Sequence, residues 1–204
     1  MLGTSPGEAY HIIQSVHNTA NIKGDICEFG VAQGVTSQLI GNEIKNLNKK
    51  LHLFDSFEGL PQPSEEDVLI DDIFDLGTME AYKGKMKFSE RNVIQKLDQI
   101  HFPKTRTIIH KGFIDQTFRA KNNLPQKISF AYVDFDFYKP ILNALNFIHL
   151  VMDEGGETII DDYNHFSAGA KAAVDEFLEK NSDSYELKIP NEAFGAFAIL
   201  KKIK

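Results

Sequence analysis

The chain has 204 residues, of which 42% are apolar and 25% charged, and this balance predicts one folded domain rather than a disordered chain. The net charge of −7 argues against nucleic acid as the main partner, because phosphate binding requires a basic face. A single cysteine, Cys27, excludes an internal disulfide. No apolar run approaches the ~20 residues of a membrane span, and no signal peptide is visible. We therefore expect a cytoplasmic protein without membrane contact.

The first predicted element is a helix to which we assign a packing role and no chemistry. Ser5 is placed to cap its first turn, Pro6 suits the first helical position, and Glu8 completes a capping box. Apolar residues then recur at helical spacing as far as Ala20, and Lys23-Gly24 ends the helix.

A short apolar strand over residues 25–29 leads into a glycine turn and then into a second helix that carries Leu39 to Leu47. The pattern E-x-G-x-x-x-G lets the backbone approach a ligand closely, and the following helix offers free N–H groups. The spacing differs from the G-x-G-x-x-G of dinucleotide enzymes. It resembles the first motif of class I S-adenosylmethionine (SAM) methyltransferases, and a plain tight turn is the alternative. The candidate SAM contacts in this stretch are Glu28, Gly30, Gly34 and Ser37.

The second predicted strand covers residues 51–54, and Asp55 follows it directly. An acid about 20 residues after a glycine turn is placed to accept hydrogen bonds from both ribose hydroxyls of a nucleoside. The alternative is a helix cap or a loop carboxylate. Asp55 and Ser56 open the run D-S-F-E-G-L-P, which resembles the signature of the macrocin O-methyltransferase (TylF/MycF-like) family. Members of that family are SAM-dependent, metal-assisted sugar O-methyltransferases of antibiotic biosynthesis.

Residues 61–87 are acidic and lack periodicity, so they form a long insertion in a compact domain. The family resemblance implies a lid over the active site, and a solvated surface loop is the alternative. Ser89 then caps a helix. The third predicted strand covers residues 106–110, and the turn after it, which contains Gly112 and Phe113, also resembles the family and by its position neighbours the adenine of SAM.

The remaining elements complete an α/β pattern. Residues 128–133 form an apolar strand, Pro140 opens a helix that Gly155-Gly156 closes, and residues 157–160 form the next strand. A helix begins at Ser167, and two strands over residues 185–189 and 196–201 follow without a helix between them, so they are antiparallel. We therefore predict one domain over residues 1–204 with the fold of class I methyltransferases: a Rossmann-like three-layer sandwich with a seven-stranded, mostly parallel sheet and an antiparallel last strand.

Two of these strands end on pairs of acids. Asp134 and Asp136 are two residues apart and point the same way in an extended chain, and Asp161 and Asp162 end a strand expected to lie beside theirs. Four carboxylates without Lys or Arg between them are protonated or share a cation. Oxygen ligands favour Mg²⁺, with Mn²⁺ or Ca²⁺ as alternatives. The competing interpretation is that the acids cap loops and helices.

Family resemblance divides these acids into roles that spacing alone does not show. In the proteins that this chain resembles, the first acid of D-x-D and both acids of D-D bind the metal, and the second acid of D-x-D is the base. This implies Asp134, Asp161 and Asp162 as ligands and Asp136 as the base, with Asp134 also beside SAM. Extended geometry points Asp161 and Asp162 to opposite sides, so both reach one ion only if the chain turns there.

The resemblance implies a SAM-dependent, Mg²⁺-assisted O-methyltransferase whose acceptor is a hydroxyl of a sugar or of another vicinal-diol small molecule. Two other functions stay open at this point: another nucleotide-cofactor enzyme on the same fold, such as an oxidoreductase, and a non-catalytic or divergent SAM-binding module. A homodimer is compatible with each of these functions. The sequence does not specify the oligomeric state or the acceptor.

Overall fold

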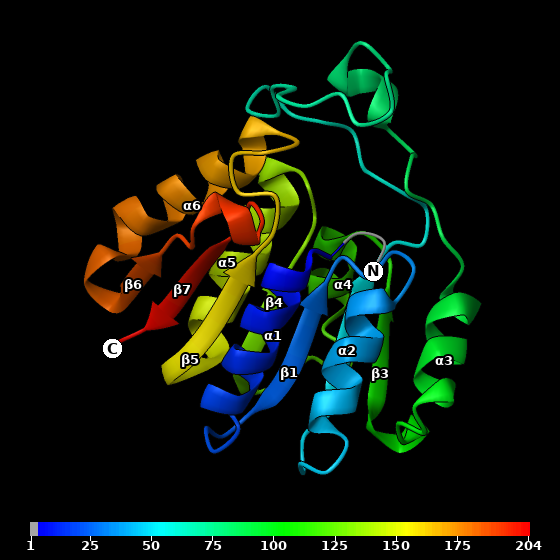
Figure 1. The fold of residues 1–204 in the computed structure, drawn as a ribbon, viewed down its shortest axis with the longest axis vertical. Helices are drawn as coiled ribbons and strands as arrows, with labels where there is room; N and C mark the ends of the chain where they lie inside the picture. The colour runs from blue at the N-terminus through cyan, green and yellow to red at the C-terminus, as the bar shows by residue number, and fades with distance from the viewer. Residues whose placement is uncertain (1–3) are drawn as a thin grey trace.

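The computed structural model describes residues 4–204 as a seven-stranded sheet with the strand order β3-β2-β1-β4-β5-β7-β6 (Figure 1). Strands β1 to β5 are parallel, and β7 lies antiparallel between β5 and β6. This confirms the predicted fold class. The strands are β1 Asp25–Phe29, β2 Leu51–Asp55, β3 Thr107–Lys111, β4 Ile128–Val133, β5 Met152–Ile160, β6 Tyr185–Lys188 and β7 Ala198–Lys202.

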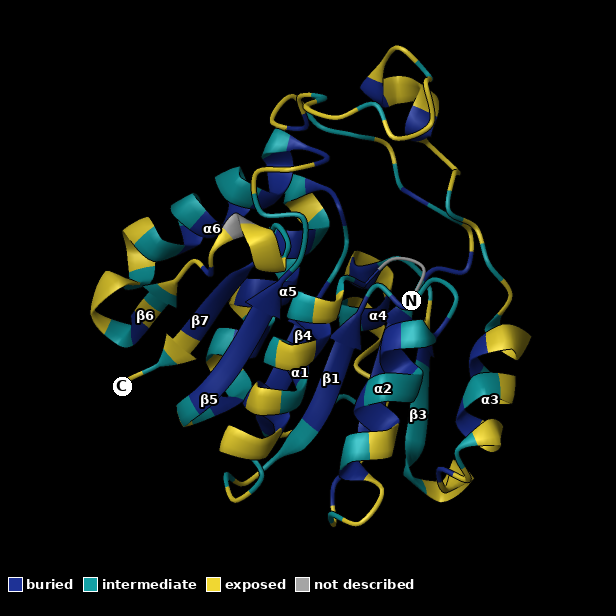
Figure 2. Ribbon diagram, in the orientation of Figure 1, coloured by how far each residue is buried: buried dark blue, intermediate teal, exposed yellow. Residues whose placement is uncertain are grey.

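Helices cover both faces of the sheet and enclose a separate apolar core on each. Side chains from α1, α2 and α3 pack into one core, and side chains from α4, α5 and α6 pack into the other. The sheet between them is dark in Figure 2 because its central strands are buried. The helices are α1 Pro6–Asn18, α2 Val35–Ile44, α3 Glu90–Gln99, α4 Ile114–Ala120, α5 Tyr138–Val151 and α6 Ala168–Asn181, with 3-10 turns η1 Met79–Tyr82, η2 Lys104–Arg106, η3 Ser182–Ser184 and η4 Glu192–Phe194.

The predicted helix caps are present. Ser5 accepts a hydrogen bond from the Glu8 amide at 3.1 Å, Ser89 from Arg91 at 3.2 Å, and Ser167 from Gly169 at 2.9 Å. The second half of the capping box predicted at α1 is wrong, because the Glu8 carboxyl accepts from Tyr132 in the core instead of returning to the Ser5 amide.

Around α5 the boundaries differ from the prediction. The helix begins at Tyr138, so Pro140 lies at its third position, where the missing N–H is not needed for an intrahelical bond. Gly155 and Gly156 lie within β5 instead of closing the helix, since β5 starts at Met152 directly after α5. Helix α4 was not predicted, because seven residues are too few to establish a helical period.

The parallel register brings the carboxyl ends of the central strands to one level. Phe29 of β1 pairs with Val133 of β4, which pairs with Ile160 of β5, so the residues that follow these strands share one edge of the sheet. Among residues 4–204, no helix is long and apolar enough to cross a membrane.

The predicted insertion, residues 61–87, projects beyond this edge and includes the turn η1 (Figure 1). It has a small apolar cluster of its own, in which Met79 and Tyr82 pack with Phe137 and Phe166 from the body of the protein. The segment therefore packs against the loops that follow β4 and β5. Its function as a lid stays a prediction, as does the single domain, whose residues 1–3 lie outside the described part of the chain.

Candidate active site

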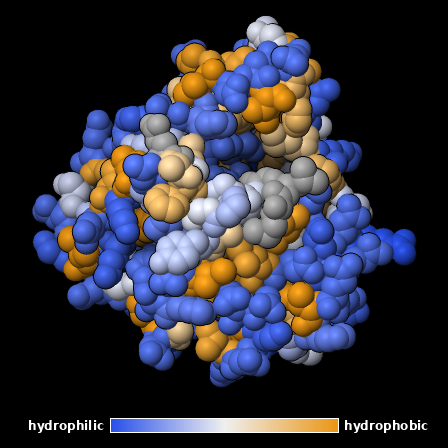
Figure 3. All heavy atoms as spheres, in the orientation of Figure 1, coloured by the Kyte–Doolittle hydropathy of each residue, from blue (hydrophilic) through white to orange (hydrophobic). Residues whose placement is uncertain are grey.

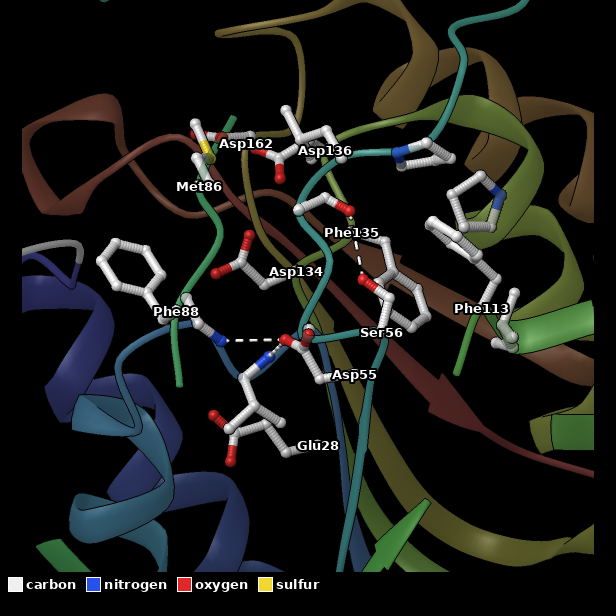
Figure 4. Close-up of a pocket in the computed structure, with 18 of the residues that line it drawn as sticks. Glu28, Asp55, Ser56, Met86, Phe88, Phe113, Asp134, Phe135, Asp136 and Asp162 are labelled. Carbon is white, nitrogen blue, oxygen red and sulfur yellow. Dashed lines mark hydrogen bonds between the residues drawn. The ribbon is translucent and has the colours of Figure 1, made fainter. Parts of the chain in front are cut away.

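A cavity of about 700 Å³ lies at the carboxyl ends of β1, β2, β3 and β4 and extends beneath the insertion (Figure 4). Its size is in the range of small-molecule and cofactor sites. Its wall contains nine of the residues that sequence analysis selected: Glu28, Gly30, Asp55, Ser56, Gly112, Phe113, Asp134, Asp136 and Asp162. The other three selected residues, Gly34, Ser37 and Asp161, are not part of the wall.

The glycine turn owes its glycines to close packing within the chain. Gly30 has a φ of +87°, and a Cβ there would lie 1.7 Å from the backbone oxygen of Asp134. Gly34, the N-cap of α2, has a φ of +75°, and a Cβ there would lie 3.0 Å from the Cα of Val93. The sequence suggested that glycine lets the backbone approach a ligand. At Gly30 the missing side chain instead lets the turn pack against the backbone of Asp134, at the end of the neighbouring strand.

Glu28 is a buried carboxyl with one unused oxygen. Its Oε2 accepts a hydrogen bond from the Ser37 hydroxyl at 2.5 Å, whereas Oε1 has no partner among the described residues. Burial, with a smaller contribution from the charge of Asp55, raises the pKa of Glu28 to about 8 against the opposing effect of the Ser37 hydrogen bond. A buried acceptor without a donor is costly, so Oε1 is suited to receive a donor group from a ligand in the cavity. Ser37 orients Glu28 and does not line the cavity itself.

Asp55 joins the end of β2 to the glycine turn. One oxygen accepts from the Val31 amide at 2.8 Å and the Ala32 amide at 3.0 Å, and the other accepts from the Phe57 amide at 2.6 Å. A carboxylate offers about four lone-pair positions. Three are therefore occupied within the chain, and one is left on a carboxylate that lines the cavity, where a ribose hydroxyl could donate to it.

Ser56 shapes the loop that continues from Asp55. Its hydroxyl donates to the Gly59 carbonyl at 3.1 Å and accepts from the Glu58 amide at 3.0 Å. Beside this loop, the Gly112 amide donates to the Asp55 carbonyl at 3.0 Å with a φ of +131° at Gly112, and Phe113 is the N-cap of α4. These residues form the side of the cavity where the sequence predicts the adenine.

Three carboxylates converge at the other side of the cavity. Asp134, Asp136 and Asp162 each offer an oxygen, and these oxygens all lie within 4.8 Å of one another. Figure 4 shows the three side chains directed into one region above Asp55 and Glu28. We call this set the carboxylate trio.

The backbone that presents the trio is unusual. Asp136 and Asp162 have φ values of +59° and +53°, in the left-handed region that few residues other than glycine occupy, although Asn and Asp tolerate it best. Such a conformation is maintained only when the surrounding structure requires it. Both residues are therefore held in place by contacts elsewhere in the chain.

Asp161 is turned away from the trio. Its Oδ2 accepts a hydrogen bond from the Tyr132 hydroxyl at 2.7 Å, and its Oδ1 accepts from the Asp162 amide at 2.8 Å. The chain does turn at Asp162, as one shared ion would require, but the structure gathers Asp136 rather than Asp161 with the other two acids.

Burial and mutual repulsion together change the acidity of this group. Burial, followed by the charge of Asp161, raises the pKa of Asp136 to about 7 and that of Asp162 to about 9. The same two causes raise the pKa of Asp134 well above its usual range. Of the described basic residues, only His165 comes within ion-pair distance of the trio, with its Nδ1 3.6 Å from Asp162. The arrangement therefore requires either protons or a cation.

Sequence analysis missed two residues behind the trio. The hydroxyl of Tyr132, in the middle of the buried strand β4, lies 3.0 Å from Oε1 of Glu8 as well as beside Asp161. Burial, and then the charge of Asp161, raises the pKa of Glu8 to about 9. Nothing in the sequence indicated this contact, because Glu8 occupies a position where an acid is expected for helix capping alone.

The insertion supplies an apolar wall. Ile73, Phe74 and Met86 line the cavity together with Phe88, which follows the insertion, and Ile73 and Phe74 remain 42% and 49% exposed. Figure 3 shows apolar side chains gathered on this projecting segment. The cavity thus has a polar floor at the sheet edge and an apolar wall under the insertion.

Comparisons with known proteins agree with this architecture. A family model described as Macrocin-O-methyltransferase (TylF) matches residues 7–190. The structure of the O-methyltransferase NovP has a TM-score of 0.78 at 20% identity and covers 97% of this chain and 80% of its own. The calicheamicin methyltransferase CalS11 has a TM-score of 0.72 at 20% identity, covering 95% and 77%. The O-methyltransferase TomG from Streptomyces achromogenes, solved with SAM, has a TM-score of 0.61 at 12% identity, covering 100% and 82%. No curated protein sequence matches significantly.

Proposed function

Since the chain belongs to the macrocin O-methyltransferase (TylF) family of SAM-dependent O-methyltransferases, we propose that it methylates a hydroxyl of a sugar or of another small molecule with a vicinal diol. We further propose that Mg²⁺ assists the reaction. The observation that carries the proposal is the carboxylate trio, which shares one cavity with the glycine turn and Asp55. The related fold of CalS11, described as a TDP-rhamnose 3'-O-methyltransferase, supports a sugar as acceptor.

The SAM site that we propose runs along the ends of β1, β2 and β3. Asp55 accepts a hydrogen bond from the ribose, Glu28 accepts one from the amino group of the methionine portion through its unpaired Oε1, and Gly112 and Phe113 border the adenine. Bound SAM supplies an electrophilic methyl group on a sulfonium. Asp134 belongs to the trio and lies against the glycine turn, which supports methyl transfer at the boundary of the two halves of the cavity.

The donor set fits a hard divalent cation. Carboxylate oxygens are the preferred protein ligands of Mg²⁺, and the trio gathers three carboxylates without a neighbouring Lys or Arg ion pair among the described residues. When bound, the ion would lower the pKa of an acceptor hydroxyl and orient it. Their convergence in the trio and the family resemblance both support Asp134 and Asp162 as ligands.

The third ligand and the base are assigned from family resemblance, and the position of Asp136 in the cavity wall supports its role as the base. Asp136 lines the cavity, so it reaches a proton on a bound acceptor, and Asp161 does not line it. We therefore keep Asp136 as the general base and Asp161 as the third ligand, which requires the Asp161 carboxyl to leave Tyr132. In this mechanism Asp136 would accept the hydroxyl proton as the new methyl–oxygen bond replaces the methyl–sulfur bond of SAM, which leaves S-adenosylhomocysteine.

The test combines binding with turnover. S-adenosylhomocysteine (SAH) release is measured with SAM, Mg²⁺ and a panel of nucleotide sugars and glycosides, each compared with an analogue that lacks one hydroxyl of the diol. We expect turnover only with an intact diol and its loss on adding a chelator. Turnover that is indifferent to the chelator would falsify the metal role, and failure of SAH to bind in calorimetry would remove the SAM site.

Single substitutions separate the two assignments. Asp136→Asn should abolish turnover and leave SAH affinity unchanged, whereas Asp161→Asn should weaken Mg²⁺ binding. Asp75→Asn, on an exposed part of the insertion, is the matched control. If Asp136→Asn weakened Mg²⁺ binding more than Asp161→Asn does, the roles of the two residues would be exchanged. Light scattering on the same samples tests the homodimer, which we include in the proposal.

A further inference from the structure

One buried carboxylate connects the insertion to the body of the protein. Asp67 is 5% exposed, and its Oδ1 accepts from the Tyr138 amide at 2.7 Å and from the Ser167 hydroxyl at 3.4 Å. Its Oδ2 accepts from the amide and hydroxyl of Ser64, at 2.7 and 2.9 Å. Tyr138 is the first residue of α5 and Ser167 is the cap of α6. A single side chain of the insertion therefore joins the starts of two helices.

The first turn of α6 is built to receive this carboxylate. A Cβ at Gly169 would lie 1.9 Å from Oδ1 of Asp67, so the carboxylate fits only because residue 169 has no side chain. The helix dipole favours a negative charge there, and the Tyr138 amide at the start of α5 donates to the same oxygen. The site is thus complementary to a carboxylate in both shape and charge.

Backbone pairing extends the same attachment. Leu69 forms a β-bridge with Ser167, the Ala168 amide donates to the Val68 carbonyl at 2.9 Å, and the Ile70 amide donates to the Phe166 carbonyl at 3.0 Å. Figure 1 shows the base of the insertion beside the loop that leads into α6. Residues 67–70 are thus held by backbone and side-chain hydrogen bonds, in addition to the apolar packing of Met79 and Tyr82 against Phe137 and Phe166.

The two joined helices follow the two loops that carry the trio. Asp136 lies two residues before Tyr138, and the loop from Asp162 leads to Ser167. Both acids have left-handed backbones, which need support from their surroundings. Asp67 contacts the end of each loop but neither of the acids in the hydrogen bonds described. It is thus placed to fix the distance between the loops without being part of the cavity wall.

We propose that Asp67 is a positioning residue, which ties the insertion to the starts of α5 and α6 and thereby sets the separation of Asp136 from Asp162. The cation-binding readout of this proposal rests on the proposed function, and the amide-exchange readout does not. The consequence is that the insertion and the trio act as one unit, so that loosening the first disorders the second.

Asp67→Asn is the sharpest test, because both oxygens of Asp67 accept from backbone amides. Asn has the same shape as Asp, but in either orientation its NH₂ group would face a backbone N–H donor. One hydrogen bond is therefore replaced by repulsion between two donors. Glu65→Gln, an exposed neighbour with the same change of charge, is the control. Hydrogen exchange is followed in the intact protein over residues 64–71, 136–142 and 162–170, together with Mn²⁺ affinity, SAH affinity and thermal unfolding.

We expect Asp67→Asn to accelerate exchange in all three segments and to weaken Mn²⁺ binding roughly tenfold or more, as loss of an outer-shell partner does, with SAH affinity unchanged. Glu65→Gln should match the wild type. Unchanged exchange over residues 136–142 overturns the proposal, and so does faster exchange with wild-type Mn²⁺ affinity, since Asp67 would then fasten the insertion without positioning the acids.

Two further results keep the test decisive. If the wild type binds no Mn²⁺, the proposed cation site fails by itself, and faster exchange over both 136–142 and 162–170 still decides the role of Asp67. If Asp67→Asn does not fold, Gly169→Ala, which places a methyl group against the same oxygen, replaces it. Gly169→Ala should reproduce the loss, and the loss in the Asp67→Ala/Gly169→Ala pair should be smaller than the sum of the two single losses, because the methyl group would lie 1.9 Å from Oδ1 of Asp67 and also 2.8 Å from the Tyr138 nitrogen. Additive losses in that pair overturn the proposal.

Discussion

Replacing Asp136 by Asn should stabilise the cation-free protein at neutral pH, and this advantage should disappear at low pH. Asp136 is 8% exposed and its carboxyl stands among other acids, whereas Asn keeps the shape and tolerates the left-handed backbone at φ +59°. The substitution therefore removes the charge with little change in packing.

The magnitude follows from the pKa of Asp136, which burial and the charge of Asp161 raise from its ordinary value of 3.8 to about 7. Each pH unit between the two values is worth about 1.4 kcal/mol, so the ionised carboxylate costs at most about 4 kcal/mol of folding free energy. Because the neighbouring acids share the protons, we expect about half of this, roughly 2 kcal/mol, or about 4–8 °C in Tm for a chain of this size.

The direction with pH is set by proton binding. The folded protein holds a proton on Asp136 more tightly than the unfolded chain, so wild-type stability falls as pH rises from about 4 to about 7 and stays low above it. Below about pH 4 the protonated carboxyl of the wild type and the amide of the variant are both neutral, so neither protein has a charge at this position. The difference between variant and wild type is thus near zero at about pH 4 and largest above about pH 7.

The assay is chemical unfolding of the wild type and Asp136→Asn at about pH 4, 5.5 and 8, each with and without Mg²⁺. Added Mg²⁺ should stabilise the wild type more than the variant and reduce the difference, because ligand binding to the folded state adds stability that grows with its affinity. A stability difference that does not change with pH would refute the electrostatic reasoning. A difference that Mg²⁺ leaves unchanged would refute Asp136 as a member of the cation's surroundings.

Two other substitutions test the SAM half of the cavity. Glu28→Gln should weaken SAH binding roughly tenfold through loss of a charge-assisted acceptor, measured by calorimetry with Ser37→Ala as a milder companion; equal affinity for wild type and Glu28→Gln contradicts the role of Oε1. Gly30→Ala should destabilise the fold by roughly 3 kcal/mol or more in chemical unfolding, because its Cβ would lie 1.7 Å from the Asp134 oxygen at a φ of +87°. Wild-type stability of Gly30→Ala would show that the two strand ends separate freely.

Local patterns were sufficient to predict the sheet and the edge that carries the site. The apolar runs of β4 and β5 stop at acids, and serines at positions 5, 89 and 167 cap the helices, because strand burial and helix capping depend on residues adjacent in sequence. Parallel strands then bring Glu28, Asp55 and Asp134 to one edge. The family signature at Asp55 added the cofactor, which no periodicity could supply.

The tertiary structure decided the contacts between residues far apart in the chain. Gly30 is required by the backbone of Asp134, Glu8 meets Tyr132 in the core, and Asp67 reaches the start of α5. Each of these residues has an ordinary local interpretation, as a turn, a helix cap or a loop acid.

The direction of each acid was decided in the same way. Asp134, Asp136 and Asp162 converge while Asp161 faces Tyr132, because left-handed backbones at Asp136 and Asp162 redirect the chain where alternation along a strand no longer applies. The sequence by itself therefore determined which acids reach the sheet edge, since that depends on local strand and helix formation. Only the packed chain determined which of them face one another, since that depends on backbone angles that distant contacts impose.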